Sequence, residues 1–147
     1  MRIYLDNCAF NRPFDDQSQI RIRLESEAKL YVQEKIKKCE IELAWSYILD
    51  IENDHNPFPE KRIAIEKWKK YAAVDVAETA SLLERASKIT IFGVKPKDAL
   101  HVSSAIEGKS DYFMTTDDKL IKRLSEIQEI HVLSPLDMLG VLDEHNN

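Results

Sequence analysis

The chain begins Met1-Arg2-Ile3-Tyr4-Leu5-Asp6-Asn7, a short apolar run that ends in a carboxylate. Its apolar core, residues 3–5, is typical of a buried strand. A second run of this kind, residues 112–116, is followed directly by Asp117. In open α/β sheets the ligand crevice lies beyond the carboxyl ends of the strands. These two strand-and-acid pairs therefore predict a site at one edge of a sheet.

The rest of the chain alternates between helical and strand-like segments. Ser46 is placed to cap a short helix that ends near Asn53, and Pro96 suits the first turn of a helix that runs to about Glu107. We predict a loop over 7–16, further helices over 17–38, 59–71, 77–90, 118–125 and 135–142, and further strands over 40–44, 73–76, 112–115 and 130–133. This alternation predicts an α/β fold with a mainly parallel sheet, and the length predicts a single domain over residues 1–147.

Composition and charge narrow the class of protein. Hydrophobic residues make up 44% and charged residues 32% of the chain, as in globular proteins that do not enter membranes. There is no signal-like segment, and two cysteines (Cys8 and Cys39) do not make a disulfide framework, so we expect a cytoplasmic protein. A net charge of −5 argues against binding nucleic acid by charge alone, unless divalent cations neutralise the acidic side chains.

Two further acids lie on the apolar stripes of predicted helices. Trp45, Ile48 and Leu49 define one stripe, and Glu52 continues it. Asp98 shares its stripe with Val102. An ionised carboxylate on a core-facing stripe costs several kcal/mol unless something pairs with it.

Three of the acids also have a structural explanation, whereas Glu52 is harder to explain in this way. Asp6 could be a turn residue, Asp98 a favourable first-turn acid, and either Asp117 or Asp118 a helix cap. The combination is more informative, because four carboxylates from four elements (Asp6, Glu52, Asp98 and Asp117) would meet at one sheet edge. They predict a divalent metal site, as in enzymes of phosphoryl transfer.

Several nearby residues have candidate roles. Arg12, Lys95 and Lys97 flank the acids and could hold substrate phosphates. His101 lies one turn from Asp98 and could be a metal ligand or proton shuttle, although a packing or surface histidine is the favoured interpretation. The sequence contains neither a zinc-type spacing nor a glycine-rich phosphate loop.

These motifs together resemble the PIN domain, and within it the VapC-like toxin ribonucleases, over nearly the whole chain. The resemblance rests on residues 3–7, on Ser46 followed by Glu52, on the run Lys97-Asp98-Ala99-Leu100-His101, and on Thr115-Thr116-Asp117. In that family a Thr-x-Asp supplies the last acid, which favours Asp117 over Asp118. Two features depart from the family pattern: Asn7-Cys8 replaces a small hydroxyl residue after the first acid, and residues 11–16 are longer and more charged than usual.

The resemblance implies a three-layer α/β/α sandwich and an endoribonuclease that uses one or two Mg²⁺ or Mn²⁺ ions. Asp6, Glu52, Asp98 and Asp117 would be the metal-binding and catalytic acids, with Asn7 and Thr115 orienting them. It also implies a homodimer and a cognate antitoxin.

Two alternative functions stay open at this point, and the nucleic-acid target could be DNA instead of RNA. The first alternative is a non-catalytic PIN module, which would bind RNA or a protein partner. A phosphatase or phospho-receiver is less favoured, because the first strand ends in Asp6-Asn7-Cys8 without the Asp-x-Asp that aspartyl-phosphate phosphatases use.

Overall fold

A five-stranded sheet, parallel throughout, forms the centre of the computed structural model, which describes residues 1–146. Its strands are β1 (Arg2–Leu5), β2 (Glu42–Ser46), β3 (Ala72–Val76), β4 (Tyr112–Met114) and β5 (His131–Leu133). They pair in the order β3-β2-β1-β4-β5, so the first strand of the chain is the central one. This arrangement confirms the predicted parallel sheet.

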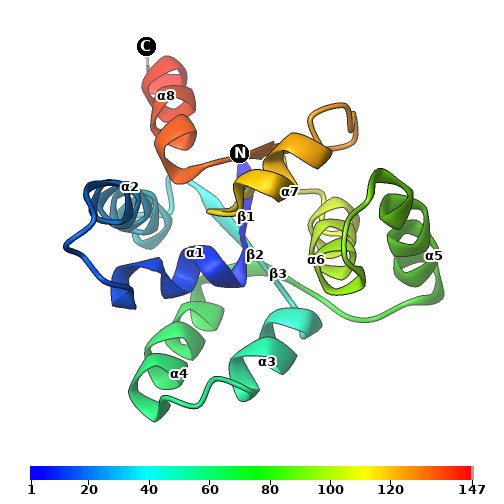
Figure 1. The fold of residues 1–147 in the computed structure, drawn as a ribbon, viewed down its shortest axis with the longest axis horizontal. Coiled ribbons are helices and arrows are strands. Elements are labelled where there is room, and N and C mark those ends of the chain that lie inside the picture. The colour runs from blue at the N-terminus through cyan, green and yellow to red at the C-terminus, as the bar shows by residue number, and fades with distance from the viewer. Residues whose placement is uncertain (147) are drawn as a thin grey trace.

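Helices cover both faces of the sheet. The α-helices are α1 (Asn7–Asn11), α2 (Ile20–Lys37), α3 (Tyr47–Asp54), α4 (Pro59–Glu66), α5 (Ala80–Ile89), α6 (Pro96–Glu107), α7 (Asp118–Arg123) and α8 (Pro135–Asn146), and the 3₁₀ helices are η1 (Arg12–Phe14), η2 (Lys67–Tyr71) and η3 (Thr90–Phe92). Helices α2 and α8 lie on one side of the sheet, and α5 and α6 lie on the other (Figure 1). The fold is therefore the expected α/β/α sandwich. No helix in the described residues is both long enough and apolar enough to span a bilayer.

The central strand positions the candidate site. Ile3, Tyr4 and Leu5 are fully buried, as expected for a strand covered on both faces. β1 pairs in register with β2 on one side and β4 on the other. Because all the strands run in one direction, Asp6 after β1 and Asp117 after β4 emerge at the same edge of the sheet.

The predicted loop over 7–16 was wrong in part, because it contains α1 and η1. The carboxylate of Asp6 accepts a hydrogen bond from the Asn7 backbone N–H and so caps α1. The Phe10 ring packs edge-on against Trp45, with 5.5 Å between centroids, and both side chains are fully buried. Long-range packing thus stabilises a helix too short to be recognised from its own sequence.

Other elements were predicted with shifted boundaries. The strand predicted over 40–44 begins at Glu42, because Cys39 turns the chain after α2 with a φ of 59°. The helix predicted over 59–71 is α4 followed by η2, and α8 extends beyond 142. The predicted cap is confirmed, since the Ser46 side chain accepts a hydrogen bond from the backbone N–H of Leu49.

Candidate functional site

One cavity at the carboxyl edge of the sheet brings the predicted acids together. Its volume is about 400 Å³, and its lining contains all four of Asp6, Glu52, Asp98 and Asp117. They come from the end of β1, from α3, from the first turn of α6 and from the start of α7. We call this space the acid cavity. Asn7 also lines it, whereas Asp118 does not.

Asp6 is almost fully buried, with only 6% of its surface exposed, and hydrogen bonds fix both of its carboxylate oxygens. One carboxylate oxygen accepts the Asn7 N–H at 2.8 Å, and the other accepts the Thr115 hydroxyl at 2.8 Å. The Cys8 sulfur lies 3.3 Å from the second oxygen. Burial, and next the charge of Asp6, raise the pKa of the Cys8 thiol to about 12, so the thiol stays protonated and is no thiolate nucleophile.

Thr115 connects two of the acids. While its hydroxyl donates to Asp6, the same oxygen accepts the backbone N–H of Asp117 at 3.1 Å. One Asp117 oxygen, Oδ1, accepts the N–H groups of Lys119 and Leu120 at 3.0 and 3.2 Å, so Asp117 is also the cap of α7. Thr115 therefore contacts both Asp6 and Asp117.

Glu52 is anchored by a chain of buried side chains. Its Oε1 meets Nε2 of His101, and its Oε2 accepts the Asn7 amide at 2.9 Å. The other imidazole nitrogen lies 2.7 Å from the Tyr4 hydroxyl, which lies 2.6 Å from the Ser46 hydroxyl. The histidine and the tyrosine are both fully buried.

Proton counting constrains the Glu52 end of this chain. An ionised Glu52 only accepts hydrogen bonds, so Nε2 of His101 carries a proton. The proton between Nδ1 and the Tyr4 hydroxyl, and that between the hydroxyls of Tyr4 and Ser46, can lie on either partner. Burial alone would raise the pKa of Glu52, but the hydrogen bond and charge of His101, with Lys97 and Asn7, lower it below its usual value. His101 is thus a packed residue that orients Glu52 from outside the cavity.

The sequence did not single out Tyr4. The one usable signal was its position in a central strand: a buried tyrosine hydroxyl needs a hydrogen-bond partner, and an aliphatic strand has none to offer. Asp50, also on α3, accepts the Trp45 indole N–H at 2.9 Å.

Asp98 is half-buried and surrounded by negative charge. Burial raises its pKa above the usual value, and the charges of Asp6 and Asp117 raise it further. A bound cation would relieve this repulsion.

The chemistry of the cavity lining suits a hard divalent ion. The Asn7 Oδ1 atom is buried and has no hydrogen-bond partner within residues 1–146. Carboxylate and amide oxygens are the ligands that Mg²⁺ and Mn²⁺ prefer. However, no three His, Cys, Asp or Glu side chains of the described residues are gathered closely enough to enclose an ion directly. The arrangement therefore fits an ion that keeps part of its water shell, for which the cavity has room.

The predicted phosphate-binding residues lie in different settings. Lys97 and Arg12 line the acid cavity, whereas Lys95 does not. Arg12 is already paired, with nitrogen atoms 3.1 Å from Asp15 and 3.5 Å from the buried Glu25. Lys97 is thus better placed than Arg12 to meet a phosphate.

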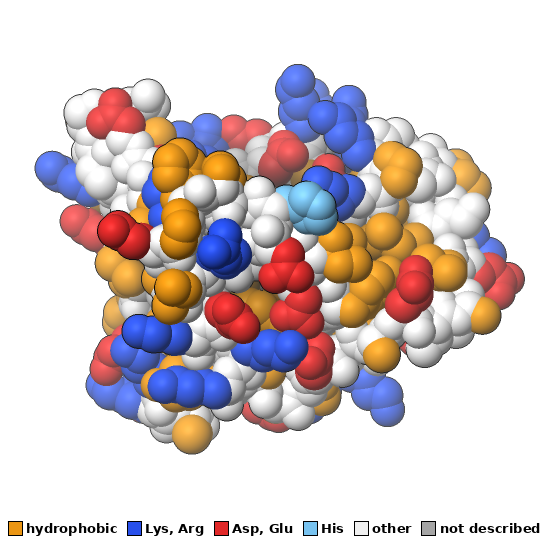
Figure 2. All heavy atoms as spheres, turned by 90° about the horizontal axis from the view of Figure 1, so that it is seen from below, with side chains coloured by type: hydrophobic (Ala, Val, Ile, Leu, Met, Phe, Trp, Pro, Cys, Tyr) orange, Lys and Arg blue, Asp and Glu red, His pale blue; other side chains and the backbone are white. Residues whose placement is uncertain are grey.

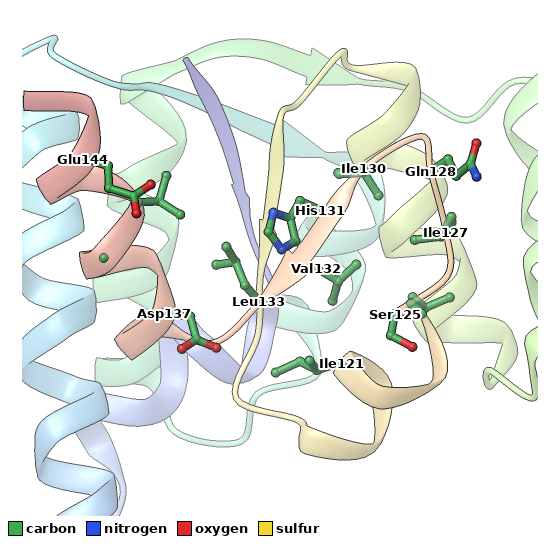
Figure 3. Close-up of a pocket in the computed structure, with 13 residues that line it drawn as sticks. Ile121, Ser125, Ile127, Gln128, Ile130, His131, Val132, Leu133, Asp137 and Glu144 are labelled. Carbon is green, nitrogen blue, oxygen red and sulfur yellow. The ribbon is translucent and has the colours of Figure 1, made fainter.

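A larger cavity, of about 610 Å³, lies elsewhere, between β5, α7 and α8 (Figure 3). Its lining is mostly aliphatic and includes Asp137 and Glu144 but neither lysine nor arginine. None of the four predicted acids lines it. We therefore place the candidate chemistry in the smaller acid cavity.

Comparisons with known proteins bear on the fold. No protein-family model matches the chain, and no curated protein matches it. Among solved structures, a chain in the crystal structure of VapBC2 from Rickettsia felis bound to a DNA fragment from their promoter is similar, with a TM-score of 0.58 and 13% sequence identity. The match covers 91% of this protein and 98% of that chain. The similarity is one of fold. It agrees with the fold that the sequence motifs implied.

Proposed function

We propose that this protein is a metal-dependent endoribonuclease of the PIN-domain, VapC-like kind. The observation that carries the proposal is the acid cavity, in which carboxylates from four separate elements line one space at the carboxyl edge of a parallel sheet. Such a set of acids is costly to place together without cations, and in α/β folds this edge is where ligands bind.

Each residue of the cavity has a role in this proposal. Asp6, Asp98 and Asp117 would hold one or two Mg²⁺ or Mn²⁺ ions, and Glu52, fixed by His101 and Asn7, would act directly or through water. The ions would supply an activated water and charge stabilisation for the leaving oxygen of a phosphodiester. Thr115 keeps Asp6 and Asp117 in a fixed relation, and Lys97 is available to bind a substrate phosphate.

We further propose that the protein is the toxin of a toxin–antitoxin pair. The similarity to a chain of a VapBC2 complex supports this class of partner. A homodimer is also expected, and Leu24, Tyr31 and Leu136 on α2 and α8 provide exposed apolar surface for one. Co-purification with the product of a neighbouring gene and light scattering of the isolated chain test these two partners separately.

The test of the nuclease is cleavage of a panel of end-labelled single-stranded RNAs in Mg²⁺, in Mn²⁺ and in EDTA. We expect cutting that requires metal and is lost in Asp98→Asn. The matched control is Asp54→Asn, because Asp54 is an exposed acid at the end of α3 and does not line the cavity. Equal cutting by wild type and Asp98→Asn would overturn the assignment, and RNA binding without cleavage would favour the non-catalytic module.

A further inference from the structure

The acid cavity continues into a second hollow of about 300 Å³. The two spaces share four lining residues, which are Asn7, Asn11, Asp15 and Glu52. The rest of the second hollow is formed where α3 ends and α4 begins. We call Asn56, Phe58 and Lys61 of this region the α3–α4 shelf. A ligand lying on the shelf would lead directly into the acid cavity.

The shelf presents aromatic surface to solvent. Phe58 is 55% exposed, and Phe14 on η1 is 40% exposed. The Lys61 ammonium lies 4.4 Å from the centre of the Phe58 ring and 5.8 Å from that of Phe14, so it stands between the two rings. An exposed aromatic ring beside a lysine is the combination on which single-stranded nucleic acids stack their bases and place their phosphates.

Lys61 is a cation without a competing partner. No carboxylate in the described part of the chain forms an ion pair with it, in contrast to Arg12. The acid cavity next to it would repel a phosphodiester, so a free cation at this border matters for binding. The face that carries α3 and α4 shows lysine, arginine and hydrophobic side chains around a central group of acids (Figure 2).

Carboxamides complete the surface. The Asn56 amide lies 3.5 Å from Oδ1 of Asn11, and the Asn56 Oδ1 atom accepts the Phe58 N–H at 3.1 Å. Both side chains line the hollow, and carboxamides can donate to and accept from base edges. The aliphatic groove beside β5 has no lysine or arginine to meet a phosphate, since Asp137 and Glu144 in its lining are acidic (Figure 3).

We propose that the α3–α4 shelf, with Phe14, binds a single-stranded nucleic acid. Bases stack on the exposed rings and a phosphate lies at Lys61, so that the strand enters the acid cavity beside Glu52. A duplex is excluded as the preferred ligand, because its base faces are already stacked. The path of the strand into the cavity rests on the proposed nuclease function, whereas the shelf's affinity for a single strand does not.

The experiment is fluorescence anisotropy with a labelled 12-nucleotide RNA, the matching DNA strand and the corresponding duplex. Binding is measured in EDTA, and again in Mg²⁺ with Asp98→Asn present in every variant, so that cleavage plays no part. We expect Phe58→Ala to weaken single-strand binding about 10-fold and Phe58→Trp to retain it. Lys61→Ala should weaken binding and reduce its salt dependence by about one phosphate contact.

Tyr71 and Lys70 provide the matched control. They also form an aromatic–lysine pair, 5.2 Å from ammonium to ring centre, but they precede β3 and so lie at the amino edge of the sheet. Tyr71→Ala should leave single-strand affinity unchanged. Equal affinities of Phe58→Ala and wild type, or duplex binding as tight as single-strand binding, would overturn the proposal.

The two proposals fail in distinguishable ways. Binding that depends on Phe58, without metal-dependent cleavage, would support the shelf and remove the nuclease. Cleavage that depends on Asp98, with binding indifferent to Phe58, would do the reverse. The RNA and DNA strands then show which sugar the shelf prefers.

Discussion

Tyr4 and His101 are 97 residues apart in the chain, yet the tyrosine hydroxyl lies 2.7 Å from Nδ1 of the imidazole. The opposite nitrogen of the ring meets Glu52 at the rim of the acid cavity. The centre of the sheet and the candidate site are thus joined by hydrogen bonds through the fully buried side chains of Tyr4 and His101. In a buried setting such bonds fix orientation, because leaving any member unpaired is costly.

Tyr4→Phe is expected to lower the free energy of unfolding by about 1–3 kcal/mol, because it leaves His101 and Ser46 without their shared partner. Urea denaturation measures the change. The control is Tyr112→Phe on β4, whose hydroxyl makes no hydrogen bond within residues 1–146; its effect should stay within about 0.5 kcal/mol. Similar losses in both variants would contradict the importance of the chain of hydrogen bonds.

Thr115→Val should separate positioning from folding. Valine has nearly the same shape, but it can neither donate to Asp6 nor accept from the Asp117 backbone. If the protein is the proposed nuclease, cleavage should fall about 10- to 100-fold and need more metal, while Thr115→Ser recovers most of the loss. Rates measured across a Mg²⁺ titration test this, and a valine variant with wild-type rates would count against it.

Divalent metal should stabilise the folded protein through Asp98. In EDTA, Asp98→Asn should melt at a higher temperature than wild type, because burial and the neighbouring carboxylates already raise the pKa of Asp98. Mg²⁺ or Mn²⁺ should then raise the Tm of wild type more than that of the variant. At a metal concentration 100 times Kd the gain for wild type would be about 2.7 kcal/mol. Identical shifts in both proteins would mean that the ion binds elsewhere.

Because Lys29 is buried, we expect the free energy of unfolding to depend on pH in a distinctive way. It is buried on α2, and burial lowers its pKa to about 7. The unfolded chain, with an ordinary lysine pKa of about 10.4, therefore binds more protons between these two values, and stability from this group rises with pH across that window. Lys29→Met should raise the free energy of unfolding by on the order of 5 kcal/mol below pH 7, and by much less near pH 10.

Urea denaturation between pH 6 and pH 10 checks this expectation. Lys67→Met is the control, since Lys67 is exposed on η2. A difference between Lys29→Met and wild type that stays constant over this range would show that the buried lysine does not titrate as expected.

The parallel sheet and the meeting of the acids could be predicted because their signals are local. Asp6 and Asp117 each follow an apolar run, and Glu52 and Asp98 occupy helix positions whose direction follows from periodicity. α1 could not be predicted, because a five-residue helix has little propensity of its own and depends on Phe10 meeting Trp45.

The support behind Glu52 was also beyond the sequence. His101 was visible as a residue near Asp98, but a pattern along one helix cannot show that its ring reaches a tyrosine on the central strand. The α3–α4 shelf could not be predicted for a similar reason. Phe14 and Phe58 come from different segments, and only the fold brings both rings close to Lys61.

The central position of β1 determines when the acid cavity can form during synthesis of the chain. The Asp6 backbone N–H donates to the Met114 carbonyl at 2.9 Å. The edge of β1 that faces β4 therefore cannot pair until residue 114 has been synthesised. Contacts this distant in sequence form slowly. A ribosome-bound chain that stops short of Asp117 carries three of the four acids without the space that joins them. The complete set of acids can therefore assemble only after translation has passed that residue.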